Sequence, residues 1–160
     1  MRATRLALYL DTSTLGAVFD RDLPERSRTS VALLEKLVAG DHEAFVSDLT
    51  LREIAAAPSE VRQGLEEWVR RLRPVGLRED EESRALARRY LDAGVFPRHA
   101  AADARHVALA SVFDLDVVVS WNFKHMVNPR RRNGVLAVNL PQGYPMIDLA
   151  APTEVLEVGP

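Results

Sequence analysis

The chain has 160 residues, of which 47% are hydrophobic and 28% charged, and its net charge is −2. This length allows one domain with a hydrophobic core, and no apolar run approaches the ~20 residues that span a bilayer. The absence of cysteine excludes disulfides, thiolate zinc sites and cysteine nucleophiles, and it fits the cytoplasmic location that we expect. Because the net charge is slightly negative, any contact with nucleic acid must come from a local basic patch.

Short apolar runs predict the strands. The first, residues 6–10, ends at Asp11 and is too short for the hydrophobic part of a signal peptide, so we interpret it as a buried strand. Further strands are expected at residues 44–46, 74–77, 116–120 and 135–138.

Segments with helical spacing of apolar residues separate these runs. Helices are expected at residues 12–19, 28–39, 49–57, 58–72, 79–93 and 101–113, with a helical turn at 124–128. Polar loops are expected at residues 20–28 and 129–134. Proline and glycine recur after Asn139, so we expect residues 139–160 to be a tail that wraps the surface of a single domain, residues 1–160.

The alternation of strands and helices indicates the fold class. Short, continuous apolar strands between helices are typical of a parallel sheet with helices on both faces. We therefore predict an α/β three-layer sandwich around a central parallel sheet of about five short strands. Ligands bind such sheets at the carboxyl ends of the strands.

Four polar residues border the apolar runs and are candidates for a functional site. Asp11 ends the first strand, Asn122 follows the strand at 116–120, and Glu53 and Asp103 lie early in two helices. A buried carboxylate is costly unless a cation or hydrogen bonds compensate its charge. If the three carboxylates meet at one edge of the sheet, they would suit a hard divalent metal ion.

Each of these residues also has a structural explanation. Asp11 is equally suited to cap the helix that follows it, and Asp103 to stabilise the first turn of its helix through the helix dipole. Asn122 could cap the turn that contains Lys124.

Glu53 has the strongest structural alternative. Thr50 and Glu53 have the spacing of a capping box, in which each side chain bonds to the backbone of the other residue. Alternatively, the helix begins near Ser47 and Asp48, which would place Glu53 on its second turn, facing Asp11.

The remaining polar signals are weaker. Arg130, Arg131 and Arg132 form a basic run that is either a solvated loop or a contact with an RNA backbone. His106 and His125 could assist a site, although isolated histidines are more often structural. The absence of HExxH, GxGxxG, P-loop and GxSxG motifs argues against zinc hydrolases, dinucleotide-binding proteins, P-loop nucleotidases and α/β-hydrolases.

In their order and spacing, these segments resemble the PIN-domain family, small metal-dependent ribonucleases that include the VapC-type toxins of bacterial toxin–antitoxin systems. The resemblance covers nearly the whole chain. The matching segments are residues 9–13, 47–54, 102–110, 119–125, 139–145 and 152–156.

The resemblance implies a central parallel sheet with its acids grouped at the carboxyl edge. On the matching positions, Asp11, Glu53 and Asp103 are expected to bind Mg²⁺ or Mn²⁺. The family often has a further acid where this chain has Asn122. The lost charge is therefore expected to weaken a second metal site.

These expectations combine into a mechanism for hydrolysis of an RNA phosphodiester. A metal ion can lower the pKa of a bound water and neutralise charge on the phosphate. We expect Asp11 and Asp103 to hold the principal ion. Glu53 would bind or orient the attacking water, and Asn122 would position a second ion or a water. The supporting hydroxyl groups in this scheme are those of Thr12, Ser13 and Ser120.

Two other functions stay open. The chain could be a non-catalytic RNA- or protein-binding module that keeps the fold but has lost turnover through Asn122. A phosphatase of the haloacid-dehalogenase type, with Asp11 as nucleophile, fits less well, because Ser13 stands where that family has a second acid.

The resemblance also leads us to expect an RNA substrate, a cognate antitoxin, a homodimer and no membrane contact. An antitoxin peptide would lie in an apolar groove between the helix with Val31 and Leu34 and the helix with Trp68.

Overall fold

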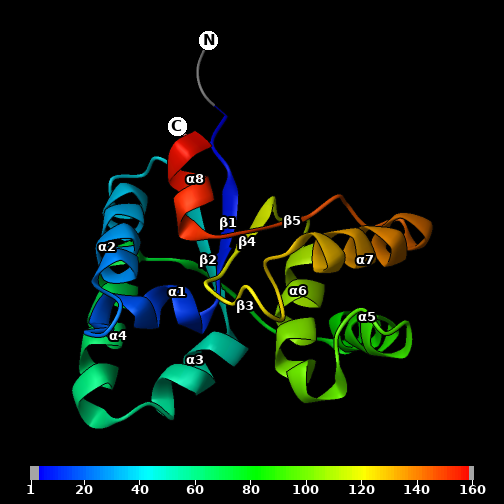
Figure 1. Ribbon diagram of the computed structural model, residues 1–160, viewed down its shortest axis with the longest axis horizontal. Coiled ribbons are helices and arrows are strands. Elements are labelled where there is room, and N and C mark those ends of the chain that lie inside the picture. Colours follow the sequence, from blue (N-terminus) through cyan, green and yellow to red (C-terminus); the bar gives the residue numbers. More distant parts are fainter. Residues whose placement is uncertain (1–3, 159–160) are drawn as a thin grey trace.

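The computed structural model describes residues 4–158, and its centre is a five-stranded, all-parallel sheet (Figure 1). The strands are β1 (Ala7–Leu10), β2 (Glu43–Ser47), β3 (Val75–Leu77), β4 (Val117–Val119) and β5 (Asp148–Ala150). The α-helices in the described residues are α1 (Thr12–Gly16), α2 (Pro24–Val38), α3 (Asp48–Ala55), α4 (Ser59–Leu72), α5 (Glu81–Asp92), α6 (Ala101–Val112), α7 (Pro129–Asn139) and α8 (Pro152–Val158). Short 3-10 helices are η1 (Ala17–Phe19), η2 (Arg98–Ala100) and η3 (Leu140–Gln142).

Helices cover both faces of this sheet. In Figure 1, α5, α6 and α7 lie on the right of the strands, and α2 and α4 lie on the left. Along β1, Leu8 and Leu10 pack into the core beneath α2 and α4, whereas Tyr9 packs into the core beneath α5 and α6. All three side chains are completely buried, as expected for a strand covered on both faces. The predicted three-layer α/β fold is confirmed.

The strand order β3-β2-β1-β4-β5 gives the sheet a switch point between β1 and β4. From β1 the chain steps outward through β2 and β3, and it then returns to the other side of β1 to form β4 and β5. At such a point the connections leave in opposite directions, which opens a crevice at the carboxyl ends of the strands. Asp11 and Ser120 directly follow the two strands that flank it.

The structure corrects the prediction for residues 129–138. The expected basic loop (129–134) and strand (135–138) are one helix, α7. Its start has strong capping signals: the side chain of Asn128 accepts a hydrogen bond from the backbone of Arg131 (3.0 Å), and Pro129 occupies the first turn.

Gly134 explains why this helix reads as a loop in the sequence. A glycine inside a helix costs about 1 kcal/mol relative to alanine, so it argues against a helix. In α7, a Cβ atom at Gly134 would lie 2.8 Å from Cγ1 of Val95. The close approach of the helix to Val95 therefore requires a residue without a side chain.

The C-terminal part of the chain is more than the expected surface-wrapping tail. Within residues 139–160, β5 pairs with β4 at the edge of the sheet, and its Leu149 is fully buried. α8 follows and packs Val155 into the core beneath α2. The prolines that suggested a tail flank these elements, since Pro145 precedes β5 and Pro152 begins α8.

The beginning of α2 is a third correction. Residues 20–28 were expected to be a loop, but the helix begins at Pro24, whose fixed backbone suits the first helical turn.

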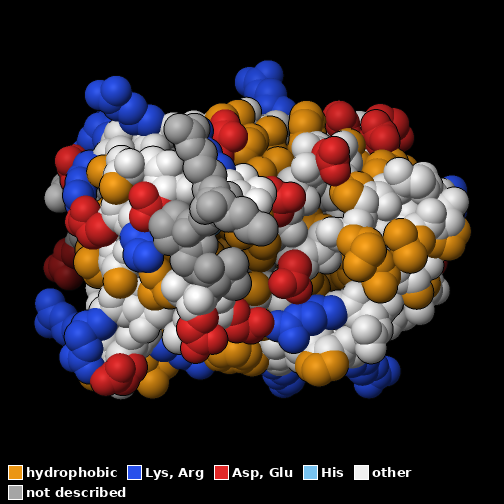
Figure 2. Space-filling model, turned by 90° about the horizontal axis from the view of Figure 1, so that it is seen from above, with side chains coloured by type: hydrophobic (Ala, Val, Ile, Leu, Met, Phe, Trp, Pro, Cys, Tyr) orange, Lys and Arg blue, Asp and Glu red, His pale blue; other side chains and the backbone are white. Residues whose placement is uncertain are grey.

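None of the helices in residues 4–158 is long and apolar enough to cross a membrane. Figure 2 shows the face on which β1 begins, where acidic and basic side chains are interspersed with hydrophobic ones. The candidate site lies at the opposite edge of the sheet.

Candidate metal centre

Asp11 lies at the carboxyl end of β1 and is 5% exposed. Its Oδ1 accepts hydrogen bonds from the Ser13 hydroxyl (2.7 Å) and from the backbone of Thr14 (3.1 Å), so it caps α1 as the structural alternative predicted. Its Oδ2 accepts a hydrogen bond from Ser120, which follows β4, at 2.5 Å. Burial raises the pKa of Asp11, and the bonds from Ser120 and Ser13 offset part of this rise. Asp11 thus joins the ends of the two central strands.

Glu53 reaches the same edge from α3. Ser47 caps this helix by accepting a bond from the backbone of Thr50 (3.3 Å), so the capping box between Thr50 and Glu53 is wrong. Glu53 instead lies on the second turn and accepts hydrogen bonds from Thr12 (2.6 Å) and from Nε2 of His106 (2.8 Å). Burial opposes its ionisation, but the bonds from His106 and Thr12 together with the nearby charge of Arg105 lower the pKa of Glu53. Glu53 is therefore an oriented carboxylate.

Behind Glu53, a buried chain of hydrogen bonds fixes the imidazole of His106. The Glu53 carboxylate only accepts, so Nε2 of His106 donates to it, and Nδ1 of the same ring is hydrogen-bonded to the Tyr9 hydroxyl at 2.5 Å. The Tyr9 hydroxyl is in turn hydrogen-bonded to the Ser47 hydroxyl at 2.6 Å. Sequence reasoning missed Tyr9. The only signal for His106 was its position three residues after Asp103, on the same face of α6.

Asp103 and Asn122 meet across the site. Nδ2 of Asn122 donates to Oδ2 of Asp103 (3.2 Å), and Oδ1 of Asn122 accepts from the backbone of His125 (3.0 Å). The capping role for Asn122 is therefore present in the structure. Burial and the charges of Asp11 and Glu53 raise the pKa of Asp103 to about 6. The charges of Asp11 and Glu53 thus disfavour ionisation of Asp103.

The donor set at this edge suits a hard divalent ion. Carboxylates from three elements gather there with hydroxyl and amide oxygens, and such oxygen ligands are preferred by Mg²⁺ and Mn²⁺. Within residues 4–158, however, no three acidic or histidine side chains are already arranged as a metal-ligand group. Asp11 and Glu53 are occupied by internal donors. A bound cation would replace some of these hydrogen bonds.

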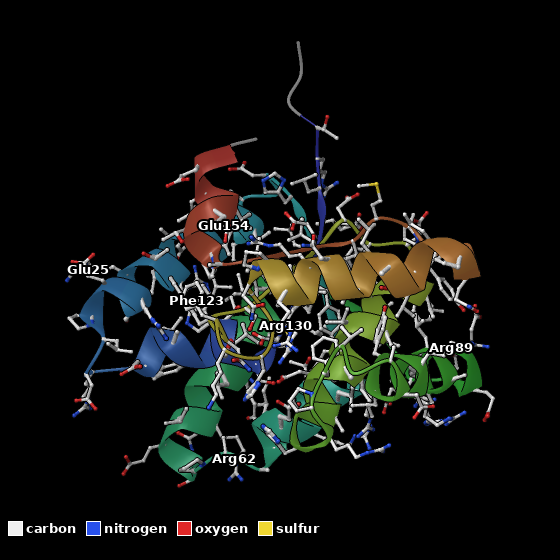
Figure 3. The ribbon with its side chains drawn as sticks, turned by 45° about the vertical axis from the view of Figure 1, so that its right-hand side comes forward. Glu25, Arg62, Arg89, Phe123, Arg130 and Glu154 are labelled. Carbon is white, nitrogen blue, oxygen red and sulfur yellow. The ribbon has the colours of Figure 1, made fainter. Side chains whose placement is uncertain are left out.

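Two of the three candidate arginines serve the fold. Arg131 donates to the backbone oxygens of His125 (3.2 Å) and Val95 (2.7 Å). Arg132 donates to the backbone of Leu149 (2.8 Å) and pairs with Glu154. Arg130 is exposed on the first turn of α7, as Figure 3 shows. Arg130 is therefore the exposed member of the run.

Comparison with known proteins supports the fold. A chain in the crystal structure of VapBC2 from Rickettsia felis, bound to a DNA fragment from their promoter, superimposes with a TM-score of 0.54. The alignment covers 91% of this chain and 98% of that chain at 14% sequence identity, a level at which the likeness shows the fold alone. No protein-family model matches the sequence, and no curated protein matches it significantly.

Proposed function

We propose that the protein is a metal-dependent endoribonuclease that hydrolyses RNA phosphodiester bonds and acts as the toxin of a type II toxin–antitoxin pair. One observation carries the proposal: three carboxylates lie at the carboxyl edge, where Ser120 bonds to Asp11, Thr12 to Glu53 and Asn122 to Asp103. Burial and the charges of Asp11 and Glu53 raise the pKa of Asp103 there. Such an accumulation of negative charge is unfavourable without a cation. The fold that the chain shares with a VapBC2 chain supports a VapC-type role.

In this proposal Asp11 and Asp103 hold the principal Mg²⁺ or Mn²⁺ ion. When bound, the ion would lower the pKa of a water molecule and offset the charge of the phosphate. Glu53 stays ionised because of its bonds to Thr12 and His106, so it is suited to orient the attacking water. Ser13 and Ser120 hold Asp11 through hydroxyl groups, and the Asn122 amide positions Asp103.

One observation favours the alternative of a non-catalytic RNA- or protein-binding module. Both polar atoms of the Asn122 amide already have partners inside the protein, Asp103 and the backbone of His125. A neutral, engaged amide contributes less to a second metal ion than the acid found in many relatives of the PIN family. The metal titration described below distinguishes the two functions.

The antitoxin partner is part of the proposal, and a hollow is present between α2 and α4, the two helices expected to flank its groove, but at their first turns. Leu34 is fully buried, and the Arg71 guanidinium lies over the Trp68 ring at 4.4 Å, so the side chains named for the groove do not line this hollow. The hollow has a volume of about 630 Å³, and its lining includes Phe19 and Val61. This hollow is the proposed contact for an antitoxin segment. A homodimer stays a prediction.

The test combines Mn²⁺ calorimetry with cleavage of single-stranded RNA, on the unmodified protein and on Asp11→Asn. Asparagine caps helices as well as aspartate does, so α1 keeps its cap while the site loses a charge. Asp92→Asn is the control, because Asp92 is 74% exposed and lies in α5, away from the site. We expect Asp11→Asn to bind Mn²⁺ at least about tenfold more weakly and to lose cleavage, and Asp92→Asn to retain both.

The possible results separate the candidate functions. Undiminished Mn²⁺-dependent cleavage by Asp11→Asn would refute the proposed ligand. RNA binding by the unmodified protein without any Mn²⁺ binding would favour the non-catalytic module.

A further inference from the structure

Phe123 is an exposed aromatic residue immediately beside the candidate metal centre. It follows Asn122, whose amide contacts Asp103, and 45% of its surface is exposed. Leaving a phenyl ring in water forgoes the stabilisation that burial would provide. A flat ligand that covered this ring would therefore gain the burial that the fold leaves unused.

The side chain of Phe123 packs against Trp121, which is itself held by hydrogen bonds. Its ring meets the ring of Trp121 nearly edge to face, with centroids 6.2 Å apart. Trp121 is 8% exposed and donates from its indole nitrogen to Ser30 of α2 (2.8 Å) and from its backbone to Ser13 (3.0 Å). Ser13 also holds Asp11. The aromatic pair and the carboxylate site are thus connected through one hydroxyl group.

A cation completes this arrangement. The guanidinium of Arg26, in the first turns of α2, lies 5.2 Å from the Trp121 ring centroid and 5.4 Å from that of Phe123. Lys124, the residue after Phe123, and Arg130 are also exposed, and Figure 3 shows Phe123 and Arg130 beside the loop that follows β4. Aromatic rings interleaved with cations are the usual components of a surface that binds single-stranded nucleic acid.

We propose that Phe123, backed by Trp121 and Arg26, is a stacking platform for one base of a single-stranded RNA whose backbone passes the carboxylate site. The inference deepens the proposed function and rests on it for the identity of the substrate. The exposed face of Phe123 receives a nucleobase, and Arg26 and Lys124 face the adjoining phosphates. Stacking recognises the flat face that every base has, so the platform positions the RNA with little dependence on its sequence.

Phe113 provides a matched comparison at the other end of β4. It is 42% exposed, almost as much as Phe123, but it lies after α6 at the amino edge of the sheet. The ring stacking and cation contacts that surround Phe123 are not found for Phe113 in the described residues. The two phenylalanines have similar exposure but different surroundings. A comparison of their variants therefore tests whether the position of Phe123, and not its exposure alone, matters for RNA binding.

The test measures RNA affinity in an Asp11→Asn background without divalent ions, so that the RNA is not consumed. The probes are fluorescein-labelled oligoadenylate and an abasic oligomer of the same length and charge. We expect Phe123→Leu to lower the affinity for oligoadenylate about 5- to 100-fold and to leave the affinity for the abasic oligomer unchanged within about twofold. Phe123→Trp is expected to restore binding, and Phe113→Leu to change neither affinity.

Three results would overturn the inference: no effect of Phe123→Leu on oligoadenylate, an equal loss for both oligomers, or no preference of the parent for oligoadenylate. Cleavage of RNA by the protein with Asp11 intact is measured in parallel with Mn²⁺. Base-dependent binding through Phe123 without any cleavage would refute the ribonuclease proposal and leave the platform intact. If the protein cleaves RNA and Phe123→Leu changes neither cleavage nor affinity, the platform would be refuted and the ribonuclease proposal would stand.

Discussion

Replacing Asp103 with asparagine should stabilise the metal-free protein, because the fold holds this carboxylate in an unfavourable place. Burial and the charges of Asp11 and Glu53 raise the pKa of Asp103 from 3.8 to about 6. Between these two pH values the folded protein keeps a proton on Asp103 that the unfolded chain has lost. The free energy of unfolding therefore falls as the pH rises through this window, and it stays lower above pH ~6.

The size of the effect follows from the shift. Each pKa unit corresponds to about 1.36 kcal/mol, so a shift of roughly two units gives an upper value of about 3 kcal/mol. Asp103 is only partly buried, and screening by water reduces this to about 1–2 kcal/mol. Asparagine at position 103 carries no charge at any pH. Its side-chain oxygen can still accept the hydrogen bond that Nδ2 of Asn122 donates to Oδ2 of Asp103 at 3.2 Å.

Urea unfolding in EDTA at two pH values measures this difference. At pH ~7.5 we expect Asp103→Asn to be more stable than the unmodified protein by about 1–2 kcal/mol, and near pH ~4 the difference should approach zero. Addition of Mn²⁺ should stabilise the unmodified protein and leave the variant unchanged. The exposed control Asp92→Asn should alter stability by less than about 1 kcal/mol. A less stable Asp103→Asn at pH ~7.5, or a gain that persists at pH ~4, would refute the reasoning.

Two further predictions concern the fold around the site. The side chain of Glu79 is 1% exposed, and the hydrogen bond from Arg105 lowers its pKa below 4.5, so this pair stabilises the fold above pH ~4.5 and loses its effect as the pH falls through the folded pKa. We expect Glu79→Gln to cost about 1–3 kcal/mol in urea unfolding at pH ~7 and much less near pH ~3, and a loss independent of pH would contradict this assignment. Gly134→Ala gains about 1 kcal/mol of helix propensity but places a methyl group 2.8 Å from Val95, which costs about 1–3 kcal/mol. Calorimetry should show a Tm lower by about 2–4 °C, and an increase in Tm would mean that Val95 moves aside freely.

The sheet was predictable because its central strands are continuous apolar runs that end at polar residues. Strand β1 stops at Asp11 and β4 stops at Ser120, and both boundaries hold in the structure to within a residue. The failures lie where a local signal depends on a distant contact. In the sequence, Gly134 indicates a loop, because its close contact with Val95 is not visible there. Likewise, the three residues of β5 form a strand only because they pair with β4.

The acidic part of the site was predictable for the same reason, whereas its supporting network was not. Residues at the ends of parallel strands share an edge, so Asp11 could be assigned there from the sequence. The position of Glu53 depended on which residue capped its helix, and the sequence alone favoured the capping box of Thr50 over the cap at Ser47 that the structure has. The bond from Tyr9 to His106 joins residues 97 positions apart, and no periodicity or spacing encodes such a pair.

The environments of the carboxylates assign them different tasks in the proposed reaction. Thr12 and His106 lower the pKa of Glu53, so it stays ionised across the neutral range and serves as a fixed acceptor for a water molecule. Asp103 has the opposite bias, because burial and the charge of Asp11 favour its protonated form up to about pH 6. The arrival of a cation would remove this bias and compensate the repulsion. The affinity for Mn²⁺ should therefore fall about tenfold per unit below pH ~6 as a proton competes for Asp103, while the orientation of Glu53 is kept.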